Sequence, residues 1–191
     1  MSLYTLLLFA HVSGAICLFI GMGTWLFGSI AIARAARVEQ VRAITDLMLV
    51  ARLLVPAGAL LVITAGVAMT WLSWGFRTGW IVVALGSLTI IGPIGTWVID
   101  PKVREIAELA HTLADGPVPM PLAKRTRDRR LRTALHMMIG MLFGIEFLMT
   151  AKPQLAVALG AMAVFALLGL ATALPLLRAN DVFMPLESRE P

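Results

Sequence analysis

Residues 3–33 read LYTLLLFAHVSGAICLFIGMGTWLFGSIAIA and contain no Asp, Glu, Lys or Arg. As an α-helix this stretch is about 45 Å long at ~1.5 Å per residue, whereas the hydrocarbon core of a bilayer is about 30 Å thick. It is therefore predicted to cross a membrane. Because it is longer than the bilayer core is thick, the helix must tilt or one of its ends must project into water. No signal-peptide pattern accompanies it, so we interpret it as a retained helix.

Four further apolar stretches follow, at about 47–74, 80–99, 133–150 and 155–177. Hydrophobic residues make up 59% of the 191-residue chain and charged residues 14%, compared with about 25% charged residues in soluble domains. The predicted fold is an all-α polytopic bundle of five transmembrane helices in one domain, residues 1–178, with a polar tail at 179–191. The lipid bilayer, and not nucleic acid, is the expected partner.

Lysines and arginines are concentrated in the first and third loops, while Arg77 and Lys152 are nearly alone in the second and fourth. The positive-inside rule then predicts an outer N-terminus and a cytoplasmic C-terminus. Trp71, Trp74 and Trp80 bracket the second loop, as is typical of an interfacial aromatic belt.

The third loop, residues 101–132, is the longest polar segment. Its first part has apolar residues at helical spacing and is predicted to be an amphipathic helix lying on the cytoplasmic membrane surface. A basic cluster follows, and it is expected to contact anionic lipid headgroups. This cluster consists of Lys124, Arg125, Arg127, Arg129, Arg130 and Arg132.

Gly14, Gly21 and Gly28 recur every seven residues in the first span and so lie near one stripe. Small residues allow helix backbones to approach closely, which favours packing inside the bundle. A homodimer seam, or a flat ligand resting on the glycines, is the alternative. In the third span, Pro93 predicts a kink, and Arg52 with Asp100 is expected to form an ion pair at the membrane boundary.

His11 and His136 are ionisable residues inside apolar spans, which makes each a candidate functional residue. Two imidazoles from facing helices can bind haem b, and Gly14 beside His11 would let the porphyrin approach the backbone. Counting residues from the outer interface places His11 about 12 Å deep and His136 about 21 Å deep. This difference is awkward for two ligands of one haem, and a hydrogen bond from each histidine to a neighbouring helix is the alternative.

Glu146 lies at a depth of about 6 Å by the same count, near the level of His11. The pair could form an interhelical hydrogen bond, a proton relay, or a metal or cation site. The methionines are interpreted as space-filling residues. The chain contains no nucleotide-binding loop, nucleophile elbow or zinc-protease motif, so whether it is an enzyme stays open.

Three segments carry a resemblance to a known family: Ser2-Leu3-Tyr4-Thr5 with the following His11-Val12 and Gly14-Ala15, then Asp100-Pro101-Lys102-Val103-Arg104, then residues 147–153. Over most of its length the chain resembles the small bacterial integral membrane proteins grouped as domain of unknown function 2269. This resemblance implies the fold and a multi-pass location in the inner membrane of a bacterium, but no activity. Through His11 and its glycines, the chain is also loosely similar to CopD-type and HemJ-type membrane proteins, which implies haem or metal binding at His11.

The leading functional hypothesis is haem binding, or proton or electron transfer, at a site centred on His11. The first alternative is a non-catalytic accessory subunit that packs against other membrane subunits. The second is a small transporter or channel, for which the proline-broken third span and Glu146 are the indications.

Overall fold

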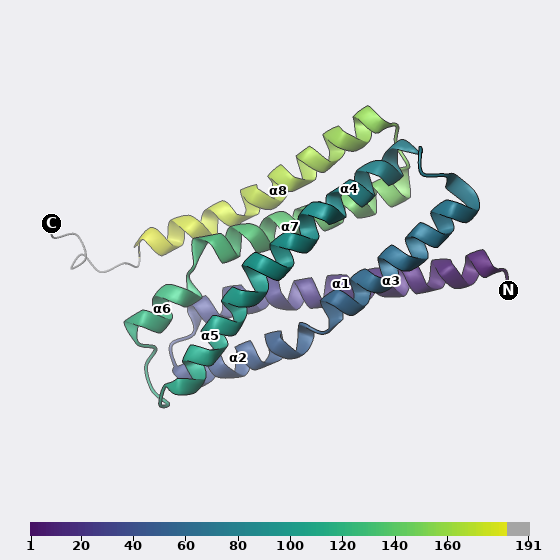
Figure 1. Ribbon diagram of the computed structural model, residues 1–191. Coiled ribbons are helices and arrows are strands. Elements are labelled where there is room, and N and C mark those ends of the chain that lie inside the picture. Colours follow the sequence, from purple (N-terminus) through teal and green to yellow (C-terminus); the bar gives the residue numbers. More distant parts are fainter. Residues whose placement is uncertain (183–191) are drawn as a thin grey trace.

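The computed structural model describes residues 1–182 and is all-helical, with no β-strand in that range (Figure 1). Five helical stretches are long and apolar enough to cross a membrane, which confirms the predicted class of fold. They comprise Leu3–Arg34, Val38–Trp74, Gly79–Thr112, Met120–Ala151 and Leu155–Pro175. Residues 183–191 of the predicted polar tail lie outside the described range.

The first of these stretches is the single helix α1 (Leu3–Arg34). The second contains α2 (Val38–Ala51), α3 (Leu54–Met69) and the π-helical turn η1 (Thr70–Trp74). The third contains α4 (Gly79–Pro93), the π-helical segment η2 (Ile94–Ile99) and α5 (Asp100–Thr112). The fourth contains α6 (Met120–Thr126) and α7 (Arg129–Ala151). The fifth lies in α8 (Leu155–Val182).

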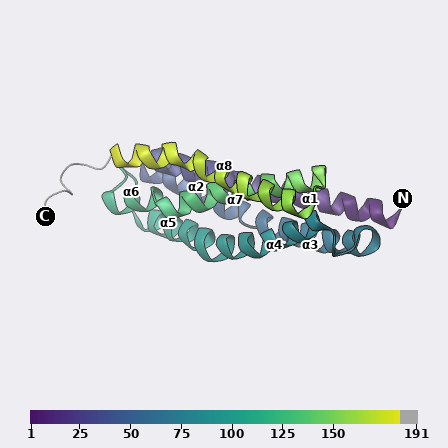
Figure 2. The ribbon, with the colours of Figure 1, turned by 90° about the horizontal axis from the view of Figure 1, so that it is seen from above.

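The helices run along one long axis, so the N-terminus and the end of α8 lie at opposite ends of the bundle (Figures 1 and 2). An odd number of crossings requires this arrangement. In the third stretch, α4 ends at Pro93 and gives way to η2. Proline lacks the amide hydrogen of a regular helical turn, and this explains the irregularity at the predicted break.

The glycine stripe of α1 lies against α2 and α3. A Cβ atom at Gly14 would lie 2.8 Å from the carbonyl oxygen of Gly58, and one at Gly58 would lie 2.7 Å from that of Gly14. Equally close neighbours at Gly21 and Gly28 are the side chains of Val55 and Met48. The stripe therefore contributes to packing within this chain, and a dimer seam through it would first have to separate these helices.

A second close helix pair joins α7 to α8. A Cβ atom at Gly140 would lie 2.3 Å from the carbonyl oxygen of Phe165, and one at Gly169 would lie 2.4 Å from that of His136. Only glycine fits at either position without moving a backbone. This pair was not predicted from the sequence, because the seven-residue spacing that indicates close packing involves only the glycines of the first span.

Helix α5 is amphipathic, as expected, but its surroundings differ from the prediction. It continues directly from η2 and packs against α2, which runs beside it (Figure 1). Its apolar residues Val103, Ile106, Ala107 and Ala110 are buried. Protein therefore covers the face that was expected to lie on lipid, because α2 runs beside α5 and supplies a partner surface.

Ion pairs hold together the end of the bundle that contains α5 and α6. Arg52 and Asp100 lie 2.5 Å apart, which confirms the expected boundary pair, and Asp100 also binds Arg104. Lys102 pairs with Asp128, the N-cap of α7. Glu105 of α5 pairs with Arg125 of α6.

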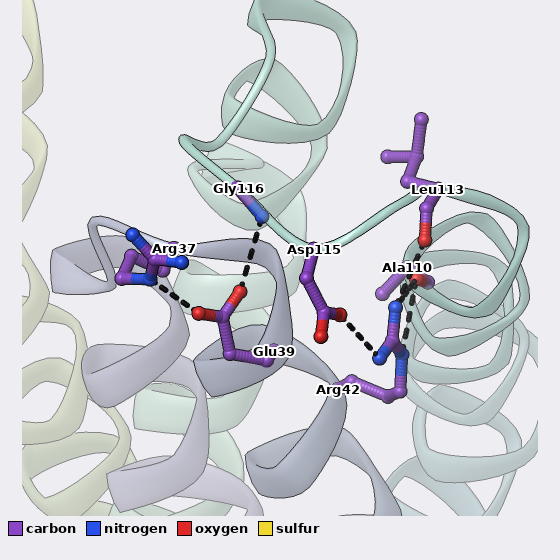
Figure 3. Close-up of polar contacts among 7 residues, drawn as sticks. All are labelled: Arg37, Glu39, Arg42, Ala110, Leu113, Asp115 and Gly116. Atoms are coloured by element: carbon purple, nitrogen blue, oxygen red, sulfur yellow. Dashed lines mark hydrogen bonds and ion pairs between the residues drawn. The ribbon is translucent and has the colours of Figure 1, made fainter.

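Hydrogen bonds and an ion pair hold the end of α5 and the loop that follows it against α2 (Figure 3). The Arg42 guanidinium donates to the carbonyl oxygens of Ala110 and Leu113 and forms an ion pair with Asp115 at 2.9 Å. Glu39 accepts a hydrogen bond from the amide of Gly116. Gly116 has a φ of 152°, a value that side chains disfavour and glycine adopts readily.

The basic cluster is not uniformly available to lipid. Lys124, Arg125, Arg129 and Arg130 are exposed, and Arg125 also pairs with Glu105. Arg132, predicted to contact headgroups with the others, is only 4% exposed and lies in the protein interior. The apolar helix positions around it are covered by neighbouring helices, so its position one turn inside α7 buries it.

Candidate ligand-binding cavity

A cavity of about 770 Å³ lies in the half of the bundle that contains the N-terminus. Helices α1, α3, α4 and α7, together with η1, form its walls. Most of the lining is apolar, with side chains such as Ile81 and Leu85 of α4. Small-molecule sites in proteins have this size and character, with a few polar groups that orient the ligand.

His11 is one of the polar groups on the wall. Its Nδ1 lies 2.9 Å from the carbonyl oxygen of Val62 on α3. A carbonyl oxygen can only accept a hydrogen bond, so Nδ1 donates, and in the neutral ring Nε2 keeps its lone pair. A Cβ atom at Gly66 would lie 3.1 Å from the imidazole, so this glycine gives the ring its room.

Aromatic side chains close the end of the cavity nearest the N-terminus. The indole of Trp74 donates to the hydroxyl of Tyr4 at 3.4 Å and packs edge-on against Trp80. The ammonium group of Lys152 lies 4.5 Å from the centre of the Trp74 ring, a cation–π contact. Lys152 has a φ of 49°, the left-handed conformation that ends α7 before Pro153.

Glu146 of α7 also lines the cavity. It is exposed, as are Phe143 on the same helix and Ile16 on α1, so the cavity is open on this side. Among the described residues, no hydrogen bond or ion pair engages its carboxylate. The structure therefore brings His11 and Glu146 to one cavity, as their similar depths predicted, without a direct bond between them.

His136 lies elsewhere, in the contact between α7 and α8. The hydroxyl of Thr172 donates to the carbonyl of Gly169 and so accepts from Nδ1 of His136, at 2.9 Å. His136 is 6% exposed, and its buried Nε2 has no hydrogen-bond partner among the described residues. Because His136 does not line the cavity, the structure does not bring the two histidines together around one ligand.

The structure also bears on two other expected ligand contacts, a porphyrin against Gly14 and a metal ion at His11 and Glu146. Gly14 faces Gly58 and Leu61 of α3, so no room for a porphyrin is left against it. The described residues contain no group of three or more His, Cys, Asp or Glu side chains placed to hold a metal ion. A metal at His11 and Glu146 would thus have two protein ligands, too few to specify an ion.

Three residues that close the cavity were not predicted from the sequence as parts of a site: Tyr4, Trp74 and Lys152. The tryptophans are predicted to form an interfacial belt and Lys152 to lie in the fourth loop, and both predictions concern position along the membrane normal. Only helix packing reveals that they meet over one cavity. The coincidence of a lysine and aromatic residues at the same predicted level was the available signal.

Comparison with known proteins gives the family. No curated protein and no solved structure gives a significant match. A family model described as a predicted integral membrane protein matches residues 5–153, which include α1 from its third residue, α2 through α7, and every residue that lines the cavity except Tyr4. The chain therefore belongs to the DUF2269 family of predicted integral membrane proteins.

Proposed function

We propose that this protein binds a small amphipathic molecule in the cavity and that His11 contacts the polar part of that molecule. The observation that carries the proposal is the cavity itself, about 770 Å³ in volume and mostly apolar, with a few polar groups on its walls. Such a volume falls within the range of known ligand sites, roughly 300–1,000 Å³.

The hydrogen bond to Val62 suits His11 to this role. With Nδ1 donating, the ring has one fixed tautomer and orientation, and Nε2 can accept a proton or bind a metal. Metal-binding histidines use the same arrangement, with the second ring nitrogen bonded to a carbonyl or carboxylate.

Haem b is a second, more specific candidate, favoured by this tautomer of His11. In that case His11 would be the protein ligand to the iron, and the apolar walls would surround the macrocycle. His136 would have no part in binding, because it lies between α7 and α8.

Absorption spectra test the haem candidate directly. The protein, expressed with ample haem and purified in detergent, should show a Soret band that shifts on reduction with dithionite. The band should be lost in His11→Ala and kept in His136→Ala, the matched control outside the cavity. A colourless wild-type protein, or loss of the band in His136→Ala alone, would remove haem at His11.

Filling the cavity tests ligand binding in general. Ala84 of α4 is buried and lines the cavity, so Ala84→Phe should displace a bound molecule. Ala57→Phe on the exposed side of α3 is the control. Small molecules that co-purify would be identified by mass spectrometry of organic extracts. An identical set of molecules from both variants would contradict the proposal.

We also propose which membrane the protein occupies and which end of the bundle faces the cytoplasm. The exposed cations Lys124, Arg129 and Arg130 lie at the end of the bundle opposite the N-terminus. Their charge supports contact with anionic headgroups on the cytoplasmic side of a bacterial inner membrane.

A further inference from the structure

We infer that the ligand of the cavity is a zwitterionic amphiphile, with an ammonium group that binds Glu146 and a phosphate group that binds Lys152. This inference rests on the proposed function, since it names the chemical class of the molecule that the cavity would hold. It starts from two opposite charges that line the same apolar cavity.

The two charges are held apart. They are six positions apart in the sequence, which corresponds to about 9 Å along a helix axis at ~1.5 Å per residue. The described residues show no ion pair between them, and the Lys152 ammonium lies instead over the ring of Trp74. The left-handed turn at Lys152 directs the chain away from α7 and places the side chain at the aromatic end.

Each charge lacks a protein counter-ion in the described part of the chain. Glu146 lies inside α7, and charged groups within membrane-spanning segments are costly and usually pair or mark a ligand pathway. Lys152 lies just past the end of this helix, where its ammonium group contacts the Trp74 ring. A purely anionic ligand would compensate Lys152 and repel Glu146, and a purely cationic ligand would do the reverse. A ligand that carries both charges compensates both.

The surroundings of each charge suit one end of such a headgroup. Phe143 lies one helical turn from Glu146 and packs against Phe19 across the α1–α7 contact, with ring centres 5.3 Å apart. Aromatic faces attract ammonium groups, and lysine is a common phosphate binder. The apolar walls formed by α3 and α4 would hold part of an acyl chain, and the side that exposes Phe143 and Glu146 gives lateral access from lipid.

Native mass spectrometry in dodecyl maltoside tests this inference. The purified protein would be offered equal amounts of dioleoyl phosphatidylethanolamine, the anionic phosphatidylglycerol, and a cationic trimethylammonium lipid with the same chains. The wild-type protein should prefer phosphatidylethanolamine. Glu146→Gln and Lys152→Gln should each weaken its binding about tenfold, as expected for loss of one charge-assisted contact.

The two variants should also differ from each other. Glu146→Gln should shift preference toward the anionic lipid, and Lys152→Gln toward the cationic lipid. Arg77→Gln, which removes an exposed charge at the same end without lining the cavity, should change nothing.

Three results would overturn the inference. A wild-type preference for a singly charged lipid, an order unchanged in both variants, or a bound haem would each leave a ligand in the cavity but of another class. Failure of the proposed function looks different: no lipid binds specifically, and Ala84→Phe changes nothing that co-purifies.

Discussion

Replacing Gly14 by alanine should destabilise the bundle, because α3 occupies the position of the added methyl group. The new Cβ would lie 2.7 Å from the Cβ of Leu61, 2.8 Å from the carbonyl oxygen of Gly58 and 2.9 Å from the amide nitrogen of Val62. Two of these atoms belong to the backbone and cannot rotate away.

The size of the effect follows from these distances. Ordinary van der Waals contact begins near 3.4 Å, so α1 and α3 would have to separate by about 0.6 Å around Gly58. Overpacking of this kind costs about 1–3 kcal/mol of unfolding free energy. The same substitution gains up to about 1 kcal/mol in helix propensity, which must be removed by a control.

Gly23→Ala is that control. Gly23 lies in the same helix, and a Cβ atom there meets nothing within 4 Å. Both proteins would be unfolded from dodecyl maltoside micelles with SDS and followed by circular dichroism, and the difference between them isolates the clash. Equal stability of the two variants would refute the argument that α1 and α3 pack backbone to backbone at Gly14.

Three further predictions concern other parts of the chain. Arg42→Ala should accelerate proteolytic cleavage of the loop that begins at Leu113, because it removes the hydrogen bonds and ion pair that fasten this loop to α2. Thr172→Val should lower the unfolding free energy by about 1–3 kcal/mol in SDS titrations, since it leaves the buried Nδ1–H of His136 without its acceptor. Arg77→Cys, combined with Cys17→Ser to remove the native cysteine, should react with a membrane-impermeant maleimide added outside intact cells, and labelling only after lysis would reverse the proposed orientation.

The class of fold could be predicted from the sequence because it follows from local properties. A charge-free run such as residues 3–33 must cross the membrane whatever surrounds it. The extents of the helices could not be predicted in this way. Hydropathy marks where lipid begins, whereas α5 and the start of α7 continue as helices because protein partners and ion pairs stabilise their polar ends.

The candidate site was predictable in part. Counting residues from the membrane boundary gives depth, and it placed His11 near Glu146 and far from His136. Depth says nothing about the direction in which a side chain points around its helix. Which helices face one another decides that His136 bonds to Thr172 on α8 and that Lys152 reaches Trp74 on η1.

The third helical stretch, Gly79–Thr112, has 34 residues and is about 51 Å long at ~1.5 Å per residue. A bilayer core of about 30 Å leaves roughly 20 Å of it outside lipid. Because ion pairs join α2, α5 and α6 there, the part of the helix outside lipid belongs to a folded region with a defined surface. An antibody fragment raised against this region would bind the protein without contacting lipid. It would add the mass that particle alignment in electron cryomicroscopy requires for a 20.6 kDa chain.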